Sequence, residues 1–231
     1  MMKENLENIR MRIAEAAKRA GREPEDVTLI AVSKTYPASD IEKAISYGCT
    51  DFGENKVQEL MGKVEVIESP VNWHLIGHLQ TNKVKYVVGK TKLIHSVDSL
   101  KLAQEIEKQS AKHNVVTKIL LEVNVGEEVS KHGLHIDEVL PLVSEISKLP
   151  HVKVEGLMTV APFVEDAEEN RTIFRKLYDL SVDIQKQKFD NISMNVLSMG
   201  MSNDFEVAVE EGATHVRIGT AIFGYRDYTK R

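Results

Sequence analysis

Lys34 is the residue of this sequence whose position most favours covalent chemistry. It follows the apolar run 29–32 and Ser33, so a strand over this run would end with the lysine amine at the mouth of a fold. Partly apolar surroundings disfavour an ammonium ion, and the uncharged amine of a lysine attacks carbonyl groups. The structural alternative is a lysine that buries its aliphatic stem at a strand end and extends its charge into water.

Two segments rich in glycine and hydroxyl groups have the chemistry of a phosphate site. Ser198 and Ser202 lie in the segment 195–204, at whose end a helix is expected to begin. Gly219 and Thr220 offer an N–H group and a hydroxyl group nearer the C-terminus. Such donors at the start of a helix favour anion binding. Either segment alone is ordinary for a loop, but the two together predict one phosphate site.

Arg217 lies inside an apolar segment. A buried arginine is rare unless it is paired. Arg217 is therefore expected either to form an ion pair inside the fold or to donate hydrogen bonds to a nitrogen or oxygen atom of a ligand.

The histidines do not have the spacing of a metal site. His74 and His78 are four residues apart, which suits metal ligation on a helix, but on an extended strand the two side chains lie far apart. We therefore predict no metal site and expect His78 to form part of a site wall. The other histidines, including His95 and His215, have no spacing that indicates a site.

Short β-branched runs alternate with longer amphipathic stretches, which predicts parallel strands joined by helical crossovers. The expected strands are 27–33, 50–53, 72–77, 92–97, 117–125, 152–160, 194–200 and 215–219. The amphipathic stretches begin near Ser39, Asn55, Thr81, Ser99, Ile136, Asp166 and Asn203. Eight strands predict an α/β fold, a single (β/α)8 TIM barrel. An open doubly wound sheet is the alternative.

An extra amphipathic helix precedes the first strand. Leu6, Ile9 and Ile13 fall on one stripe at helical spacing, and Gly21 is expected to end the helix. No low-complexity linker interrupts the pattern. We therefore expect residues 1–231 to form one domain, with the helix over 1–21 packed on the barrel.

The barrel prediction explains why the reactive residues belong together. In such barrels the functional side chains lie at the C-terminal ends of the strands, and phosphate is often held after strands seven and eight. Polar side chains at or just after the expected strand ends are Lys34, Asn55, His78, Ser198, Ser202 and Arg217. The segment 124–133 after the fifth strand is either a lid over this rim or an ordinary exposed loop.

The composition limits the function classes. A formal net charge of −5 argues against a protein that coats nucleic acid. The lysines at 83, 85, 90 and 92 are expected to form a solvated face. Cys49 is the only cysteine, which excludes an intrachain disulfide and a thiolate zinc cluster. With no secretory signal and no apolar run that spans a bilayer, we expect no membrane partner and a cytoplasmic location.

Six short motifs resemble those of the YggS/PROSC family of pyridoxal phosphate homeostasis proteins. This family's fold resembles the barrel domain of bacterial alanine racemase. The motifs are AVSKT at 31–35, FGEN at 52–55, HLIGHLQTNK at 74–83, GLMT at 156–159, SMGMSND at 198–204 and RIGTAIFG at 217–224. They occur in the family's order and span nearly the whole chain.

The resemblance implies pyridoxal 5'-phosphate (PLP) as the cofactor, held as an imine on Lys34. It also implies that Arg217 faces the pyridine nitrogen. The implied phosphate ligands are Ser198, Ser202, Gly219 and Thr220, while Asn55 and His78 would lie along the cofactor and Met158 near its ring. An arginine at the ring nitrogen keeps that nitrogen unprotonated, since two positive charges repel, and makes the ring a poorer electron sink.

These features favour a protein that holds, buffers and delivers PLP without turnover. We expect it to be a monomer or weak dimer that binds PLP, other B6 vitamers and PLP-dependent apoenzymes. One alternative is a small amino-acid racemase, which needs an acid or base on each face of the substrate carbon. No partner for Lys34 is evident, and we expect no second domain like that of alanine racemases after the last strand. The other alternative is a phosphosugar isomerase that uses Glu54 or Glu122 as its base.

Overall fold

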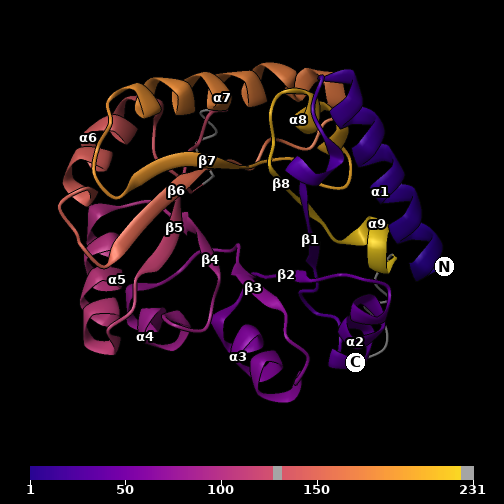
Figure 1. Cartoon of the computed structure of the whole chain (residues 1–231), viewed down its shortest axis with the longest axis horizontal. Coiled ribbons are helices and arrows are strands. Elements are labelled where there is room, and N and C mark those ends of the chain that lie inside the picture. Colours follow the sequence, from indigo (N-terminus) through magenta and orange to yellow (C-terminus); the bar gives the residue numbers. More distant parts are fainter. Residues whose placement is uncertain (127–131, 225–231) are drawn as a thin grey trace.

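The strands of this chain pair in sequence order, and the last returns to the first. A computed structural model describes residues 1–126 and 132–224, in which β1 to β8 form a closed parallel barrel (Figure 1). The strands are β1 Thr28–Val32, β2 Asp51–Glu54, β3 Asn72–Leu75, β4 Leu93–Val97, β5 Thr117–Glu122, β6 Val152–Met158, β7 Ile192–Ser198 and β8 His215–Ile218. The pairing of β1 with β8 closes the ring, with Ile30 opposite Arg217. The barrel prediction is confirmed, and the open sheet is wrong.

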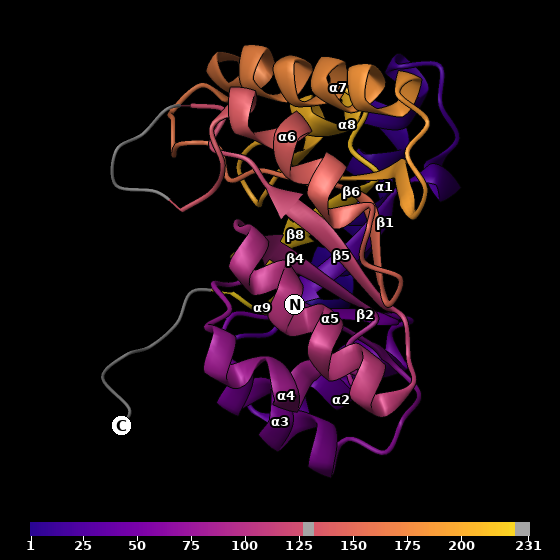
Figure 2. The ribbon, with the colours of Figure 1, turned by 90° about the vertical axis from the view of Figure 1, so that its left-hand side faces the viewer.

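Helices surround the barrel because each connection carries an apolar stripe that packs on the strands. In Figure 2, α6 and α7 lie along one side and α3 and α4 along the opposite side. The α-helices are α1 Met2–Arg19, α2 Ala38–Ser46, α3 Val57–Val66, α4 Val84–Val87, α5 Leu100–His113, α6 Ile136–Ile146, α7 Arg171–Lys186, α8 Phe205–Glu210 and α9 Thr220–Phe223. Three 3-10 turns are η1 Pro24–Asp26, η2 Thr81–Lys83 and η3 Ala167–Asn170.

The N-terminal helix α1 packs against α8 and α9 beside the barrel (Figure 1). Its predicted stripe, including Leu6, Ile9 and Ile13, is buried. The helix ends at Arg19, and Gly21 follows in the left-handed conformation (φ +67°), as the sequence predicts.

The barrel interior contains polar residues. Alternate residues of a strand face the same side of a sheet, so one set from each strand points inward. On β2, β3, β4 and β8 this set includes Asp51, His74, His95 and Arg217, all of which are buried. A separate small apolar cluster of Leu93, Leu120 and Met158 also lies in the core.

No helix in the part of the chain that the structure describes combines the length and the apolar character needed to cross a membrane.

Candidate ligand-binding site at the barrel mouth

A cavity of about 690 Å³ lies at the C-terminal ends of the strands. Its walls come from the ends of β1 and β8 and from segments that follow β1, β2, β3, β6, β7 and β8, which are distant in the sequence and meet at this rim. The lining residues are Val32, Lys34, Asn55, Ile76, Val160, Pro162, Phe163, Met201, Ser202, Asn203, Asp204, Arg217, Gly219, Thr220 and Ala221.

Six of the nine residues predicted for the site line this one cavity: Lys34, Asn55, Ser202, Arg217, Gly219 and Thr220. The structure places His78, Met158 and Ser198 elsewhere. Met158 is buried in the small apolar cluster. Ser198 is fully buried, and its hydroxyl group contacts His95 and Arg217.

The loop between β7 and α8 is wound tightly around Gly200. This residue has φ +89°, and a Cβ atom there would lie 2.6 Å from the Cβ atom of Ala208, so a side chain would push the loop away from α8. Asp204 fixes the same loop, because its Oδ1 accepts a hydrogen bond from the backbone N–H of Met201 at 2.7 Å. Its Oδ2 accepts a second bond from Asn170 Nδ2 at 2.8 Å. The one carboxylate in the lining is thus engaged on both oxygen atoms.

The backbone after β8 approaches β1 closely. A Cβ atom on Gly219 would lie 3.2 Å from the carbonyl oxygen of Val32 and 3.3 Å from its Cβ atom. The absence of a side chain therefore allows the two cavity walls, one with Lys34 and the other with Thr220, to come together.

The turn that carries Lys34 is held from outside the barrel by a buried polar network. Lys63 on α3 donates hydrogen bonds to the carbonyl oxygen of Ser33 at 2.8 Å and to Glu54 Oε1 at 2.7 Å. The Ser33 hydroxyl group also donates to Glu54 Oε1, at 2.6 Å. Glu59 accepts bonds from Lys63 and from the backbone N–H of Thr35. The residues on both sides of Lys34 are therefore fixed.

Arg217 connects the cavity to the barrel interior. Its Nη1 donates to Ser198 Oγ at 2.6 Å, and its Nη2 donates to the carbonyl oxygen of Thr159 at 2.8 Å. Burial lowers the pKa of Arg217 to about 10, so the guanidinium remains charged at neutral pH. Sequence reasoning left open an ion pair or a ligand donor, and the structure shows a buried cation that lines the cavity.

His78 lies at the outer edge of the rim. Its ring stacks on that of His132 with centroids 4.4 Å apart, and its Nδ1 is 3.8 Å from Asp98 Oδ2. Among the residues that the structure describes, these three form the one group of histidine and carboxylate side chains whose ligand atoms lie within 4.8 Å of one another. His74 takes no part in this group, because Asp51 and His95 engage its two ring nitrogens.

The two carboxylates considered as an isomerase base do not line the cavity. Glu54 is buried between the barrel and α3, where Ser33 and Lys63 bind it. Glu122 ends β5 with little exposure, and burial, followed by the charge of Asp98, raises its pKa. In the cavity wall that the structure describes, the carboxylate is Asp204, and both of its oxygen atoms accept hydrogen bonds from the protein, so the isomerase alternative lacks an available base there.

The cluster of lysines at 83, 85, 90 and 92 was predicted to form a solvated face, but Lys92 also contacts the barrel. Its Nζ lies 3.1 Å from Asp51 Oδ1.

The segment 124–133, predicted as a lid or an exposed loop, includes residues 127–131, which lie outside the described residues.

Three buried histidines in the barrel predict acid sensitivity. Burial lowers the pKa of His74 and His95, and it lowers the pKa of His215 to about 3. The unfolded chain takes up these protons near pH 6.5 and the folded chain does not, so stability should fall as the pH decreases below about 6.5. Urea denaturation between about pH 8 and pH 4 measures this change. We expect His215→Gln to flatten the profile, while His113→Gln, at an exposed helix end, should leave it unchanged. A midpoint independent of pH over this range would contradict the prediction.

Comparison with known proteins gives consistent matches over nearly the full chain. Residues 5–227 match the family described as alanine racemase, N-terminal domain. A pyridoxal phosphate homeostasis protein of Aquifex aeolicus is 47% identical over 226 residues, which cover 97% of this chain and 98% of that protein. PipY of Synechococcus elongatus, solved with PLP bound, is 36% identical with a TM-score of 0.81 and covers 92% of this chain and 100% of its own. An alanine racemase of Clostridium difficile, 16% identical, shares the fold with a TM-score of 0.72 over 96% of this chain and 57% of the racemase.

Proposed function

Because the chain belongs to the family of pyridoxal phosphate homeostasis proteins, we propose that it binds PLP in the mouth cavity and holds it for buffering and delivery. The observation that supports this best is the convergence of the Lys34 amine, the Arg217 guanidinium and the hydroxyl groups of Ser202 and Thr220 on one cavity. When bound, the cofactor supplies an aldehyde that reacts with amines and a pyridine ring that withdraws electrons.

The residues present fit such a molecule. An aldehyde needs an amine, a phosphate group needs convergent donors, and the ring nitrogen needs a polar partner. The cavity offers one of each kind, and the Asp204 carboxylate does not oppose an anion because both of its oxygen atoms accept hydrogen bonds from the protein. Gly219 also leaves space beside Val32 that a Cβ atom would take.

We assign the covalent attachment to Lys34, since Lys34 is the lysine in the described cavity wall: its amine would condense with the aldehyde group to a C=N bond, and the aldehyde oxygen would leave as water. Ser202, Gly219 and Thr220 bind the phosphate, and Asn55 lies along the cofactor. Arg217 donates toward the ring nitrogen. Because Arg217 stays protonated at neutral pH, it disfavours a proton on that nitrogen and so disfavours fast carbanion chemistry.

We propose that the protein acts as a carrier of PLP and not as an enzyme. Racemisation would need a second acid or base across the cavity from Lys34. In the described lining the one carboxylate, Asp204, is engaged in the loop. We propose a monomer or weak dimer, because the residues of one chain supply the amine, the guanidinium group and the hydroxyl groups that the ligand needs. We extend the proposal to other B6 vitamers and to PLP-dependent apoenzymes as recipients.

The phosphate assignment predicts a selective loss of affinity. Thr220→Val and Ser202→Ala each remove one hydroxyl donor to a charged group, which costs about 1.5–3 kcal/mol, or roughly tenfold or more in the dissociation constant for PLP. Absorption titration with PLP measures this loss. Pyridoxal, which lacks the phosphate, is the matched ligand, and its affinity should stay unchanged. Equal losses for both ligands would place the two hydroxyl groups away from the phosphate.

The distinction between carrier and racemase needs a separate experiment. The PLP-loaded protein is incubated with L-alanine and with D-alanine, and the two enantiomers are followed by chiral chromatography. We expect no sustained interconversion. Interconversion that is lost in Lys34→Ala would favour the racemase.

A further inference from the structure

Five buried side chains form a continuous hydrogen-bonded chain through the barrel. Arg217 Nη1 is 2.6 Å from Ser198 Oγ, and Ser198 Oγ is 2.9 Å from His95 Nδ1. His95 Nε2 is 2.9 Å from His74 Nδ1, and His74 Nε2 is 2.9 Å from Asp51 Oδ1. The bond between His95 on β4 and Ser198 on β7 joins strands that are not neighbours in the sheet, so it crosses the barrel interior.

When both histidines are neutral, the two ends of this hydrogen-bonded chain fix the direction of every bond in it. The Asp51 carboxylate only accepts, so His74 carries its proton on Nε2 and accepts on Nδ1. His95 must then donate from Nε2 and accept on Nδ1, and Ser198 donates to it. The Ser198 oxygen accepts from Arg217, which has only donors. One arrangement, with both histidines neutral, satisfies all four bonds.

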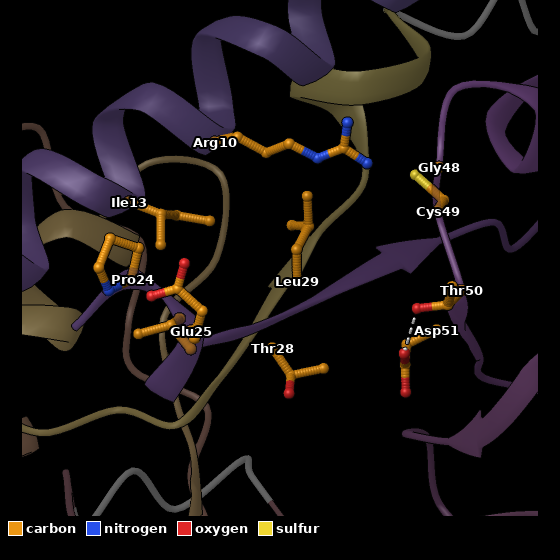
Figure 3. Close-up of a pocket in the computed structure, with 11 residues that line it drawn as sticks. Arg10, Ile13, Pro24, Glu25, Thr28, Leu29, Gly48, Cys49, Thr50 and Asp51 are labelled. Carbon is orange, nitrogen blue, oxygen red and sulfur yellow. Dashed lines mark hydrogen bonds between the residues drawn. The ribbon is translucent and has the colours of Figure 1, made fainter.

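The Asp51 end borders a second cavity at the opposite face of the barrel. Figure 3 shows Asp51 and Thr50 in this cavity, with Arg10 and Ile13 of α1 on another wall. Thr50 Oγ1 donates to Asp51 Oδ2 at 2.8 Å, and Lys92 Nζ lies 3.1 Å from Asp51 Oδ1. The hydrogen-bonded chain therefore runs from the Asp51 carboxylate, near one end of the barrel, to the Arg217 guanidinium in the mouth cavity at the other end.

We propose that Asp51, His74, His95 and Ser198 are positioning residues, which hold the Arg217 guanidinium as a fixed donor toward the ring of the bound cofactor. This inference rests on the proposed function. It also reassigns Ser198 from the phosphate to the orientation of Arg217, because its hydroxyl group is fully buried and has contacts on both sides.

Burial is the main reason that both histidines are neutral. It lowers the pKa of each, and the positive charge of Lys92 acts in the same direction on His74, as does that of Arg217 on His95. Asp51 opposes burial at His74, where its hydrogen bond and its charge raise the pKa, but the net shift is downward. His215 on β8 faces both rings, with centroid distances of 6.1 and 6.4 Å. A proton added to His95 Nδ1 would turn this atom from an acceptor into a donor, and the Ser198 hydroxyl group would then have to turn its hydrogen away from His95.

Two acidic side chains also act on Arg217, at the other end of the hydrogen-bonded chain. Glu122 on β5 and Asp204, before α8, both favour the charged guanidinium. Asp51 differs from the other two because it acts through the hydrogen-bonded chain.

The tautomers of the two histidines provide a test that needs no cofactor. In ¹⁵N-labelled apo protein, we expect His74 and His95 to be neutral and protonated on Nε2 from about pH 6 to pH 8. Asp51→Asn keeps the shape but offers both a donor and an acceptor to His74, so both tautomers should become populated. Cys49→Ser is the matched control, because Cys49 borders the same cavity as Asp51 but is not part of the hydrogen-bonded chain.

The positioning role is tested with PLP bound. We expect Asp51→Asn to shift the midpoint of the pH titration of the visible absorption band to lower pH by roughly one unit, since removal of a negative charge disfavours a bound proton. Ser198→Ala breaks the same chain with the loss of a single oxygen atom and should also shift the midpoint. It serves as the second variant if Asp51→Asn does not fold.

The outcomes separate the two proposals. An Nδ1 proton on either histidine in the native protein overturns the chain. An unchanged titration midpoint in both variants, with the predicted tautomers in the native protein, overturns the positioning role. Failure of the native protein to bind PLP overturns the proposed function, while the tautomers still report on the chain.

Discussion

Lys34→Ala will abolish the covalent attachment of PLP to the protein. Lys34 lines the mouth cavity together with Arg217 and Thr220, and it is the lysine in the described cavity wall. Without its amine, only hydrogen bonds and charge would retain the cofactor. We expect retention through gel filtration to fall by about 100-fold or more, because the covalent bond no longer slows dissociation.

Borohydride reduction followed by peptide mass spectrometry measures the attachment site directly. The native protein should carry one pyridoxyl group on the peptide that contains Lys34, and Lys34→Ala should carry none at that site. Lys85→Ala removes an exposed lysine of α4 and is the matched control, which should behave as the native protein does. Lys34→Arg keeps the positive charge without the nucleophilic amine and should also carry no adduct. An adduct that moves to a different lysine without loss of affinity would reject this site.

The barrel was predictable from the sequence because its strands are marked by short β-branched runs with regular spacing. All eight expected strands are present, although β3, β5, β6 and β7 end two to three residues earlier than predicted, and β7 also begins two residues earlier. The mouth residues Lys34, Asn55 and Arg217 were also predictable. Parallel strands in a closed barrel bring their C-terminal ends to one rim, so position at a strand end is sufficient to gather these residues.

The barrel interior was less predictable. The spacing of His74 from His78 bears only on metal binding, and His95 has no spacing that indicates a site. The usable signal was the alternation along each strand, because residues two positions apart face the same side of a sheet. Arg217 lies two residues before Gly219, and His74 lies two residues before Ile76; Gly219 and Ile76 both line the cavity. The registers of the strands decide which inward-facing polar residues form hydrogen bonds across the barrel. The sequence of a single strand does not encode these registers. For the same reason Met158, expected near the cofactor, is in the interior cluster.

Lys63→Met will destabilise the fold by about 3–5 kcal/mol, since it leaves the buried Glu54 carboxylate without its cation. Glu54 is fully buried, and its Oε2 has no hydrogen-bond partner among the described residues, so Lys63 and Ser33 provide its compensation. Urea denaturation at pH 7 measures the loss. Lys56→Met, at an exposed position just before α3, is the matched control and should change stability by less than about 0.5 kcal/mol.

The pH dependence identifies the cause of this loss. Burial already raises the pKa of Glu54, and loss of Lys63 raises it further, so the folded variant binds a proton that the unfolded chain releases above about pH 4.5. The stability deficit of Lys63→Met should therefore shrink as the pH decreases from 7 toward about 5. Glu54→Gln in the Lys63→Met background should recover much of the deficit at pH 7. A deficit that is independent of pH, and that Glu54→Gln does not relieve, would indicate lost packing in place of an unpaired charge. Because Lys63 also holds the carbonyl group of Ser33, the same variant should weaken PLP retention through the adjacent Lys34.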